Sequence, residues 1–244
     1  MPTTGLTTEW QLFLITLLVY ANALNCGFCF DDISAIVDNK DLKPHTPWSN
    51  LFWHDFWGTP MSREQSHKSY RPLCVLTFRL NYLVHGLQPW GYHLTNIVLH
   101  AGVCILYFKV LKKAALANSR VATISGYLFA VHPVHTEAVT GVVGRAELLS
   151  SWFFLLTLLL YQKSCKSYKG SFSHIALALA MVSVSCAMLC KEQGITVLGI
   201  LVIYEVFVVQ KFSLKRITAF KVDLAFILRM LTVLTTGLLL LGFR

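Results

Sequence analysis

The sequence predicts an all-α membrane protein that crosses the bilayer about seven times and carries one long loop after its first span. The 244 residues are 55% hydrophobic and 14% charged, whereas soluble domains carry about 25% charged residues. The mean hydropathy is +0.57. Apolar runs recur along the chain, and basic residues gather in alternate connections between them. This composition excludes a soluble enzyme domain and a disordered tail. It also excludes a nucleic-acid-binding module, although the net charge is +9.

Seven apolar runs are the candidate spans. They cover approximately residues 10–24, 94–111, 121–131 with a continuation toward 143, 148–161, 175–190, 195–209 and 224–243. A helix needs about 20 apolar residues to cross the hydrocarbon core, so several of these runs are short. The first run is either a retained anchor or a cleaved signal peptide, since Ala21-Asn22-Ala23 matches a cleavage site. We expect an anchor, because no basic residue precedes the run and Glu9 lies just before it.

The charged residues predict which loops share a side of the membrane. Three short segments, 109–120, 163–169 and 211–221, hold 11 of the 21 basic residues. The alternate segments 31–91, 132–147 and 191–192 hold nine of the 12 acidic residues. Seven spans with a cytosolic N-terminus place every basic loop in the cytosol. The loop that begins with Asp31 and Asp32 then faces the lumen or the exterior.

The loop 31–91 is too long to be a simple connection. Within residues 48–57, Phe52, Trp53, Phe56 and Trp57 recur at helical spacing. This pattern predicts an amphipathic helix that lies in the membrane interface with its aromatic face toward lipid. A helix packed on the protein itself explains the same pattern equally well.

Asp31 and Asp32 follow the first span directly. A carboxylate at this position is a candidate general base. The alternative is a helix N-cap for the segment that begins at Ile33, because Asp is a favoured capping residue. The residues alone leave both interpretations open.

Further polar groups occur at the predicted luminal ends of later spans. Pro133 is a residue type that starts short helices, and such a helix places His132 and His135 on one face near Glu137. The metal-binding pattern H-E-x-x-H is absent, so hydrogen bonding or phosphate contact is the expected role of the two histidines. We expect no metal site, since the pair Cys26 and Cys29 also lacks a second pair of ligands.

Two cations lie beside carboxylates at predicted span ends. These are Arg145 with Glu147, and Lys191 with Glu192. Ionisable groups at membrane depth are costly and indicate function. The alternative is a pair of weak, exposed ion pairs at the level of the lipid headgroups.

Taken together, the motifs resemble the transmembrane O-mannosyltransferases targeting cadherins, a family of the GT-C superfamily. The resemblance covers nearly the whole chain from about residue 10. It depends on Phe30-Asp31-Asp32, Asp55-Phe56-Trp57-Gly58-Thr59, His67-Lys68-Ser69-Tyr70-Arg71-Pro72-Leu73, Tyr92-His93-Leu94-Thr95-Asn96, His132-Pro133-Val134-His135-Thr136-Glu137-Ala138-Val139, Val143-Gly144-Arg145-Ala146-Glu147 and Lys191-Glu192-Gln193-Gly194.

This resemblance implies a multi-spanning enzyme of the endoplasmic reticulum membrane. Such an enzyme transfers mannose from dolichyl-phosphate-mannose to Ser or Thr of cadherin domains. The family's helical module is followed by luminal tetratricopeptide repeats. We therefore expect residues 1–244 to form a single, truncated GT-C-like membrane domain without the repeats.

The resemblance also implies roles for individual residues. The general base is Asp31 or Asp32, with Asp31 slightly preferred, and direct displacement inverts the β-linked donor to an α-mannoside. The candidates for binding the donor phosphate are Arg71, His132, His135, Arg145 and Lys191. Glu137 and Glu192 orient the acceptor or the cations. Cationic side chains neutralise the phosphate, so the scheme needs neither a metal ion nor another cofactor.

Two other classes explain parts of the sequence. A non-catalytic membrane isoform that binds partners fits the abrupt end of the chain. A transporter would also explain charged residues at the ends of membrane spans, but transporters typically show broken spans and paired repeats. Here the charges cluster at one membrane face, which favours chemistry on a lipid-linked substrate.

Overall fold

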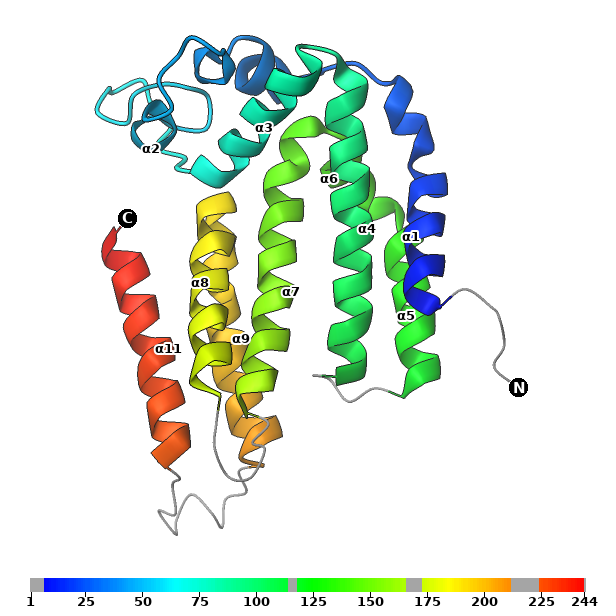
Figure 1. The fold of residues 1–244 in the computed structure, drawn as a ribbon, viewed down its shortest axis with the longest axis vertical. Helices are drawn as coiled ribbons and strands as arrows, with labels where there is room; N and C mark the ends of the chain where they lie inside the picture. Colours follow the sequence, from blue (N-terminus) through cyan, green and yellow to red (C-terminus); the bar gives the residue numbers. More distant parts are fainter. Residues whose placement is uncertain (1–6, 114–117, 166–172, 212–223, 244) are drawn as a thin grey trace.

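The computed structural model describes residues 7–113, 118–165, 173–211 and 224–243, whose named secondary-structure elements are all helical (Figure 1). The α-helices are α1 (Thr8–Val19), α2 (Asn50–Trp53), α3 (Pro72–His85), α4 (Pro89–Lys113), α5 (Ser119–Val131), α6 (Thr136–Thr140), α7 (Arg145–Cys165), α8 (His174–Cys190), α9 (Val197–Tyr204) and α11 (Leu224–Phe243). Shorter 3-10 or π turns are η1 (Ala21–Asn25), η2 (Ile33–Val37), η3 (Lys40–Leu42), η4 (Pro133–His135), η5 (Val142–Gly144), η6 (Glu192–Thr196) and η7 (Glu205–Val209). The all-α membrane class predicted from the sequence is confirmed.

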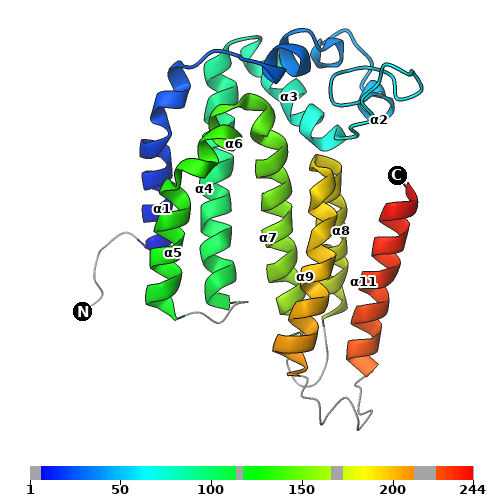
Figure 2. The same ribbon diagram turned by 180° about the vertical axis from the view of Figure 1, so that it is seen from behind.

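The long helices lie side by side, and α2 and α3 lie across one end of them (Figure 1). Within the described ranges, four segments are long and apolar enough to cross a membrane: Pro89–Lys113, Val142–Cys165, Glu192–Val209 and Leu224–Phe243. The helices α1 and α8 are apolar but shorter. Viewed from behind, α9 lies against α8 and between α7 and α11 (Figure 2). These elements coincide closely with the predicted apolar runs.

The predicted continuation of the third run toward residue 143 is wrong. The helix α5 ends at Val131, and η4, α6 and η5 follow it as separate short pieces. Pro133 explains the break, because its ring and missing N–H prevent an uninterrupted helix through this point. The His132 Nδ1 atom accepts a hydrogen bond from the Val134 N–H at 3.1 Å, which caps the new turn. A polar segment therefore lies between α5 and α7.

We call residues 33–85, which contain η2, η3, α2 and α3, the cap. Its loop from 54 to 67 is held by Asp55, whose carboxylate is 2% exposed. That carboxylate accepts hydrogen bonds from the backbone N–H groups of Trp57, Thr59 and His67 and from the Ser66 hydroxyl, at 2.7–3.1 Å. A side chain that binds so many local N–H groups competes directly with helix formation.

The predicted helix over residues 48–57 is therefore wrong in extent. Only the single turn α2 forms, and it ends at Trp53. Phe56 is buried in the core, whereas Phe52 and Trp53 remain 60% and 72% exposed. The four aromatic residues consequently divide between packing on the protein and an exposed surface.

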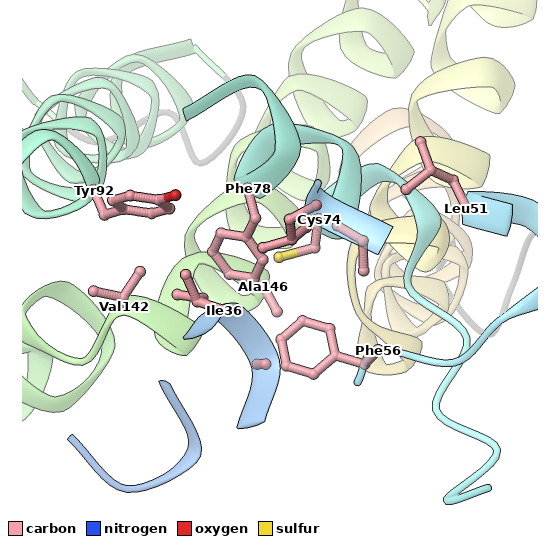
Figure 3. Close-up of a cluster of buried hydrophobic side chains, with 11 residues drawn as sticks. Ile36, Leu51, Phe56, Cys74, Phe78, Tyr92, Val142 and Ala146 are labelled. Atoms are coloured by element: carbon pink, nitrogen blue, oxygen red, sulfur yellow. The ribbon is translucent and has the colours of Figure 1, made fainter. Parts of the chain in front are cut away.

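One buried cluster joins the cap to the bundle (Figure 3). Phe56, Cys74 and Phe78 of the cap pack with Tyr92 of α4 and Ala146 of α7. The rings of Phe56 and Phe78 lie 5.8 Å apart. Burial raises the pKa of the Cys74 thiol to about 12, so this thiol behaves as an apolar packing group.

The basic ends of α4 and α7 lie opposite the cap. Lys112 and Lys113 end α4, Lys163 lies in the last turn of α7, and both ends point away from α3 (Figure 1). This arrangement agrees with the charge asymmetry in the sequence. Other basic residues of the same prediction, Lys166, Lys169, Lys215, Arg216 and Lys221, lie outside the described residues.

A buried ion pair ties α11 to the rest of the bundle. The Arg229 Nη2 atom lies 2.7 Å from the Glu205 Oε1 atom, and both side chains are almost completely buried. The Tyr161 hydroxyl of α7 donates a further hydrogen bond of 2.9 Å to Glu205. Because a charge buried without its partner is costly, this contact places three helices in one register.

Candidate functional site

A cavity of about 800 Å³ lies between the cap and the bundle ends. We call it the central cavity. Its wall comes from the turn before η2, the cap loop with Phe56 and Trp57, the residue before α3, the segment between α5 and α7 with the first turn of α7, and the residue after α8. The charged residues that line it are Asp31, Asp32, Arg71, Glu137, Glu147 and Lys191. Five of these six residues are among the site residues predicted from the sequence.

The two adjacent carboxylates have different surroundings. Asp32 is 1% exposed, and its Oδ1 and Oδ2 atoms accept hydrogen bonds from the backbone N–H groups of Val143 and Cys29, at 2.9 and 3.2 Å. Asp31 is exposed on the cavity wall. Within the described part of the chain, no hydrogen bond to the Asp31 carboxylate occurs. Asp32 therefore fastens the cavity wall, and Asp31 is available to a ligand.

The residue before Asp31 has an unusual backbone. Phe30 has a φ of +45°, a conformation that residues with a side chain rarely adopt. Its ring is 93% exposed and lies on the cavity wall. Local strain of this kind is found preferentially at functional sites. The turn therefore presents an apolar ring and the Asp31 carboxylate together.

Arg71 enters the cavity from the residue that precedes α3. Its Nη2 and Nε atoms lie 3.0 and 3.2 Å from the Glu192 Oε2 atom. Its guanidinium also lies 5.1 Å from the centre of the Phe56 ring. Both charged side chains are about one-fifth exposed, so Arg71 keeps a charge at the cavity without full hydration.

Lys191 enters from the residue that follows α8. Its ammonium forms an ion pair with the Glu147 carboxylate of α7. Lys191 is mostly buried, whereas the Glu147 side chain is about half exposed. In the sequence Glu147 lies near Arg145, and that spacing alone predicts no site role for Glu147. Only the fold reveals that its partner is Lys191.

Arg145 does not line the central cavity. It is fully buried, and its guanidinium donates hydrogen bonds to the Asn96 and Asn81 side chains and to the backbone carbonyls of Tyr92 and Thr77. These contacts join α3, α4 and α7 around one side chain. In this arrangement Arg145 positions the cavity wall and does not extend into the cavity.

The two predicted histidines lie beside the cavity wall and not on it. His135 packs with its ring centre 4.3 Å from Phe129 and 5.1 Å from His100. His132 is exposed and caps η4. Burial and, to a lesser degree, His132 lower the pKa of His135. The neighbouring residues of the same segment, Val134 and Glu137, do line the cavity. Among the residues described here, no group of three His, Cys, Asp or Glu side chains could hold a metal ion.

Two smaller pockets adjoin the central cavity, each of them at one of the two ion pairs. An apolar groove of about 520 Å³ is lined by Phe52, Trp53, Met61, Lys68, Tyr70, Met188, Leu189, Glu192 and Phe243. A polar notch of about 320 Å³ is lined by Glu147, Ser150, Ser151, Phe154, Lys191, Gln193, Gly194 and Thr196. Arg71 and Glu192 thus stand between the cavity and the groove, and Glu147 and Lys191 belong to both the cavity and the notch.

Two glycines bring the wall segments into close contact. A Cβ atom on Gly194 would lie 2.4 Å from the carbonyl carbon of Ala187, and one on Gly144 would lie 2.4 Å from the carbonyl oxygen of Ala138. Any larger residue at either position must displace backbone. These glycines therefore set the positions of Lys191 and Glu147.

Comparison with known proteins identifies relatives over most of the chain. Human protein O-mannosyl-transferase TMTC3 is 57% identical over 206 residues, which are 82% of this chain and 22% of the relative. Protein O-mannosyl-transferase tmtc2 of Xenopus laevis is 48% identical over 93% of this chain and 28% of its own length. Human protein O-mannosyl-transferase TMTC4 is 43% identical over 89% of this chain.

The aligned part is a minor portion of each relative: the chain spans between 22% and 32% of the length of these three proteins. No family model matches the chain, and no solved structure matches it. The identity nevertheless extends over most of the chain and includes three distinct members of one group. The chain therefore belongs to the family of these protein O-mannosyl-transferases and corresponds to their N-terminal membrane part.

Proposed function

We propose that this chain is the catalytic membrane part of an enzyme that transfers mannose from dolichyl-phosphate-mannose to Ser or Thr hydroxyls. The observation that carries the proposal is one cavity containing the available Asp31 carboxylate together with two cations, Arg71 and Lys191. An acceptor hydroxyl needs a base, and a phosphate leaving group needs positive charge. The names of the relatives support the same reaction class.

In the proposed reaction, Asp31 takes the proton of the acceptor hydroxyl. The acceptor oxygen forms a bond to C1 of mannose while the bond from C1 to the phosphate oxygen breaks. The electron pair of that bond leaves with the phosphate, whose charge Arg71 and Lys191 stabilise. A single direct displacement inverts the β-linked donor to an α-mannoside. Asp32 acts indirectly, because its bonds to Cys29 and Val143 hold the turn that carries Asp31.

The donor is proposed to lie across the Arg71–Glu192 pair. Its phosphate contacts Arg71 and Lys191, and its sugar occupies the central cavity near Asp31. Its isoprenoid tail follows the apolar groove, which contains Phe52, Trp53 and Met188. The groove borders Glu192 on one side, so the tail and the phosphate occupy adjacent spaces. Arg145, His132 and His135 position the wall of this site.

Our proposals for the acceptor and for the cellular location depend on the family resemblance and on the distribution of basic residues. We propose the endoplasmic reticulum membrane, a cytosolic N-terminus and a luminal cap. The acceptor is a luminal protein, with cadherin domains as the first class to test. Glu137 lines the cavity and is the residue proposed to orient the acceptor hydroxyl. The basic ends of α4 and α7 support this sidedness.

Mannose transfer in microsomes tests the proposal. Membranes that contain the chain receive radiolabelled dolichyl-phosphate-mannose and a cadherin-domain acceptor. We expect transfer that Asp31→Asn abolishes and that Asp38→Asn preserves, since Asp38 is an exposed carboxylate of the cap that does not line the cavity. Absence of transfer by the unmodified chain and by a version extended past Arg244, at matched expression, would instead favour the non-catalytic class.

A further inference from the structure

The dipeptide Lys191-Glu192 takes part in both ion pairs of the central cavity. Lys191 pairs with Glu147, and Glu192 pairs with Arg71. Lys191 has an extended backbone, with φ −156° and ψ 141°. Consecutive side chains of an extended segment point to opposite sides, and accordingly Lys191 lines the central cavity while Glu192 lines the apolar groove. Each cation proposed to contact the donor phosphate is thus already paired with a carboxylate from another element.

The charge on the phosphate increases during the proposed reaction. The donor is a phosphodiester with one negative charge, whereas the product is a phosphate monoester. A monoester carries about −1.5 to −2 at pH 7. Two unpaired cations would therefore hold the product more tightly than the donor, and slow product release limits turnover in many enzymes. A site with this chemistry benefits from anions that compete with the product.

We infer that Glu147 and Glu192 are release residues, which compete with the prenyl phosphate product for Lys191 and Arg71. This inference rests on the proposed function and adds a role to it. When the donor binds, its phosphate displaces the two carboxylates from the cations. After the mannose has moved to the acceptor and Asp31 has taken the hydroxyl proton, the carboxylates pair again with the cations. The phosphate monoester then leaves with its full charge.

The geometry suits this exchange better than a purely structural role. Glu147 is 45% exposed, and it borders both the cavity and the polar notch, which gives its side chain space to move. Arg145 is an example of a cation with a structural role in this chain. It is fully buried, and side-chain amides and backbone carbonyls accept its hydrogen bonds. Lys191 and Arg71 keep part of their surface open to the cavity.

The test compares Glu147→Gln and Glu192→Gln with two control variants. Glu137→Gln removes the same charge from the same cavity, and Glu64→Gln removes it from an exposed position of the cap. Farnesyl phosphate serves as a soluble product analogue. For every variant we measure the inhibition constant of farnesyl phosphate. For Glu147→Gln, Glu192→Gln and Glu64→Gln we also measure the KM for the donor and the rates of single and multiple turnovers, and Glu137→Gln is left out there because Glu137 is proposed to orient the acceptor.

We expect the inhibition constant to fall by about threefold to tenfold in the Glu147 and Glu192 variants. The donor KM falls less, because the donor carries less charge. Multiple-turnover rates fall, while the single-turnover rate changes little. Glu137→Gln and Glu64→Gln change the inhibition constant less than twofold. A merely structural role predicts the opposite sign, since displaced cations weaken both donor and product binding, and that result would overturn the inference.

A binding measurement separates this inference from the proposed function. Thermal stabilisation of the detergent-solubilised chain by farnesyl phosphate needs no mannose transfer. Stronger stabilisation in Glu147→Gln than in the unmodified chain, even without any transfer activity, supports the competing carboxylates while the proposed reaction fails. Equal or weaker stabilisation in a folded Glu147→Gln protein would reject the inference that the carboxylates compete with the product. Glu147 is the decisive position, because its greater exposure makes its substitution the gentler of the two.

Discussion

The Arg71 guanidinium and the Glu192 carboxylate lie 121 positions apart in the chain and form an ion pair with 3.0 Å between Nη2 and Oε2. Arg71 lines the central cavity, and Glu192 lines the apolar groove. This single contact therefore joins the cap to the end of α8 and marks the boundary between the two spaces.

Arg71→Lys should weaken donor binding without removing the positive charge. Lysine loses the planar fork that allows Nε and Nη2 to act together. We expect the donor KM to rise by about fivefold to tenfold, with a smaller change in kcat. Steady-state transfer assays with Arg63→Lys as the control measure this effect, because Arg63 is exposed on the cap. Equal KM values for the two variants would argue against a phosphate contact.

Asp31→Asn and Asp32→Asn should differ in stability as well as in activity. Asp32→Asn weakens the acceptor for two backbone N–H groups, and a hydrogen bond to a charged group contributes about 1.5–3 kcal/mol. Asp31→Asn should change stability by less than about 0.5 kcal/mol, as exposed substitutions usually do. Thermal unfolding in detergent compares the two. If Asp31→Asn proves the less stable variant, the assignment of the two roles is reversed.

Gly194→Ala should destabilise the chain and lower transfer. The new Cβ atom would meet the Ala187 backbone at 2.4 Å, and displaced backbone costs about 1–3 kcal/mol. The same displacement moves Lys191 and Glu192 away from their partners. Gly199→Ala is the matched control, since nothing lies within 4 Å of a Cβ there. Thermal unfolding and transfer rates should both separate the two alanine variants.

Acidification should destabilise the chain partly through His135. Burial and His132 lower the pKa of His135 in the folded state, so the unfolded state binds more protons as the pH falls through about 6.5. The free energy of unfolding therefore decreases below that pH and is retained above it. The loss of Tm between pH 7.5 and pH 5.5 should be smaller for His135→Gln than for the unmodified chain. His45→Gln, at an exposed position of the cap, should leave that loss unchanged.

The sidedness of the cap is open to a direct test by engineered glycosylation. Glu64→Asn creates the acceptor Asn-Gln-Ser at residues 64–66, and Lys169→Asn creates Asn-Gly-Ser at residues 169–171. With a luminal cap, microsomes should glycosylate the first variant and not the second. A mobility shift sensitive to endoglycosidase reports the result. The reverse pattern would overturn the proposed orientation.

The apolar helices were the part of the fold most readable from sequence. A run long enough to span a membrane has few other stable conformations in lipid, and the run at residues 224–243 coincides with α11. The helix predicted over residues 48–57 is longer than the one that forms. The helical spacing of aromatic residues carries no information about the hydrogen bonds of Asp55, which end the helix. Local side-chain competition thus overrode periodicity.

The site was readable as a set of residue types, and its pairings were not. Asp31, Arg71 and Lys191 were expected in one place, and they do line one cavity. Arg145 belongs to the same motif as Glu147, yet it is buried and saturated by amides. Sequence spacing shows that a cation lies near a wall, but only the packing of three helices decides whether its head group turns inward or outward.

The contact between Glu205 and Arg229 also bears on how the chain reaches the membrane. An arginine at the centre of a helix costs about 2.5–3.5 kcal/mol during insertion by the translocon, and one nearer a helix end costs less. Arg229 is the sixth of the 20 residues of α11. Arg229 avoids most of that cost once Glu205 is beside it. We therefore expect α11 to enter the bilayer most favourably while η7, which carries Glu205 and follows α9, is still near the insertion channel. Insertion of α11 into the membrane thus depends on a residue of the preceding helical segment. We expect a substitution of Glu205 to reduce first the fraction of α11 that integrates into the membrane.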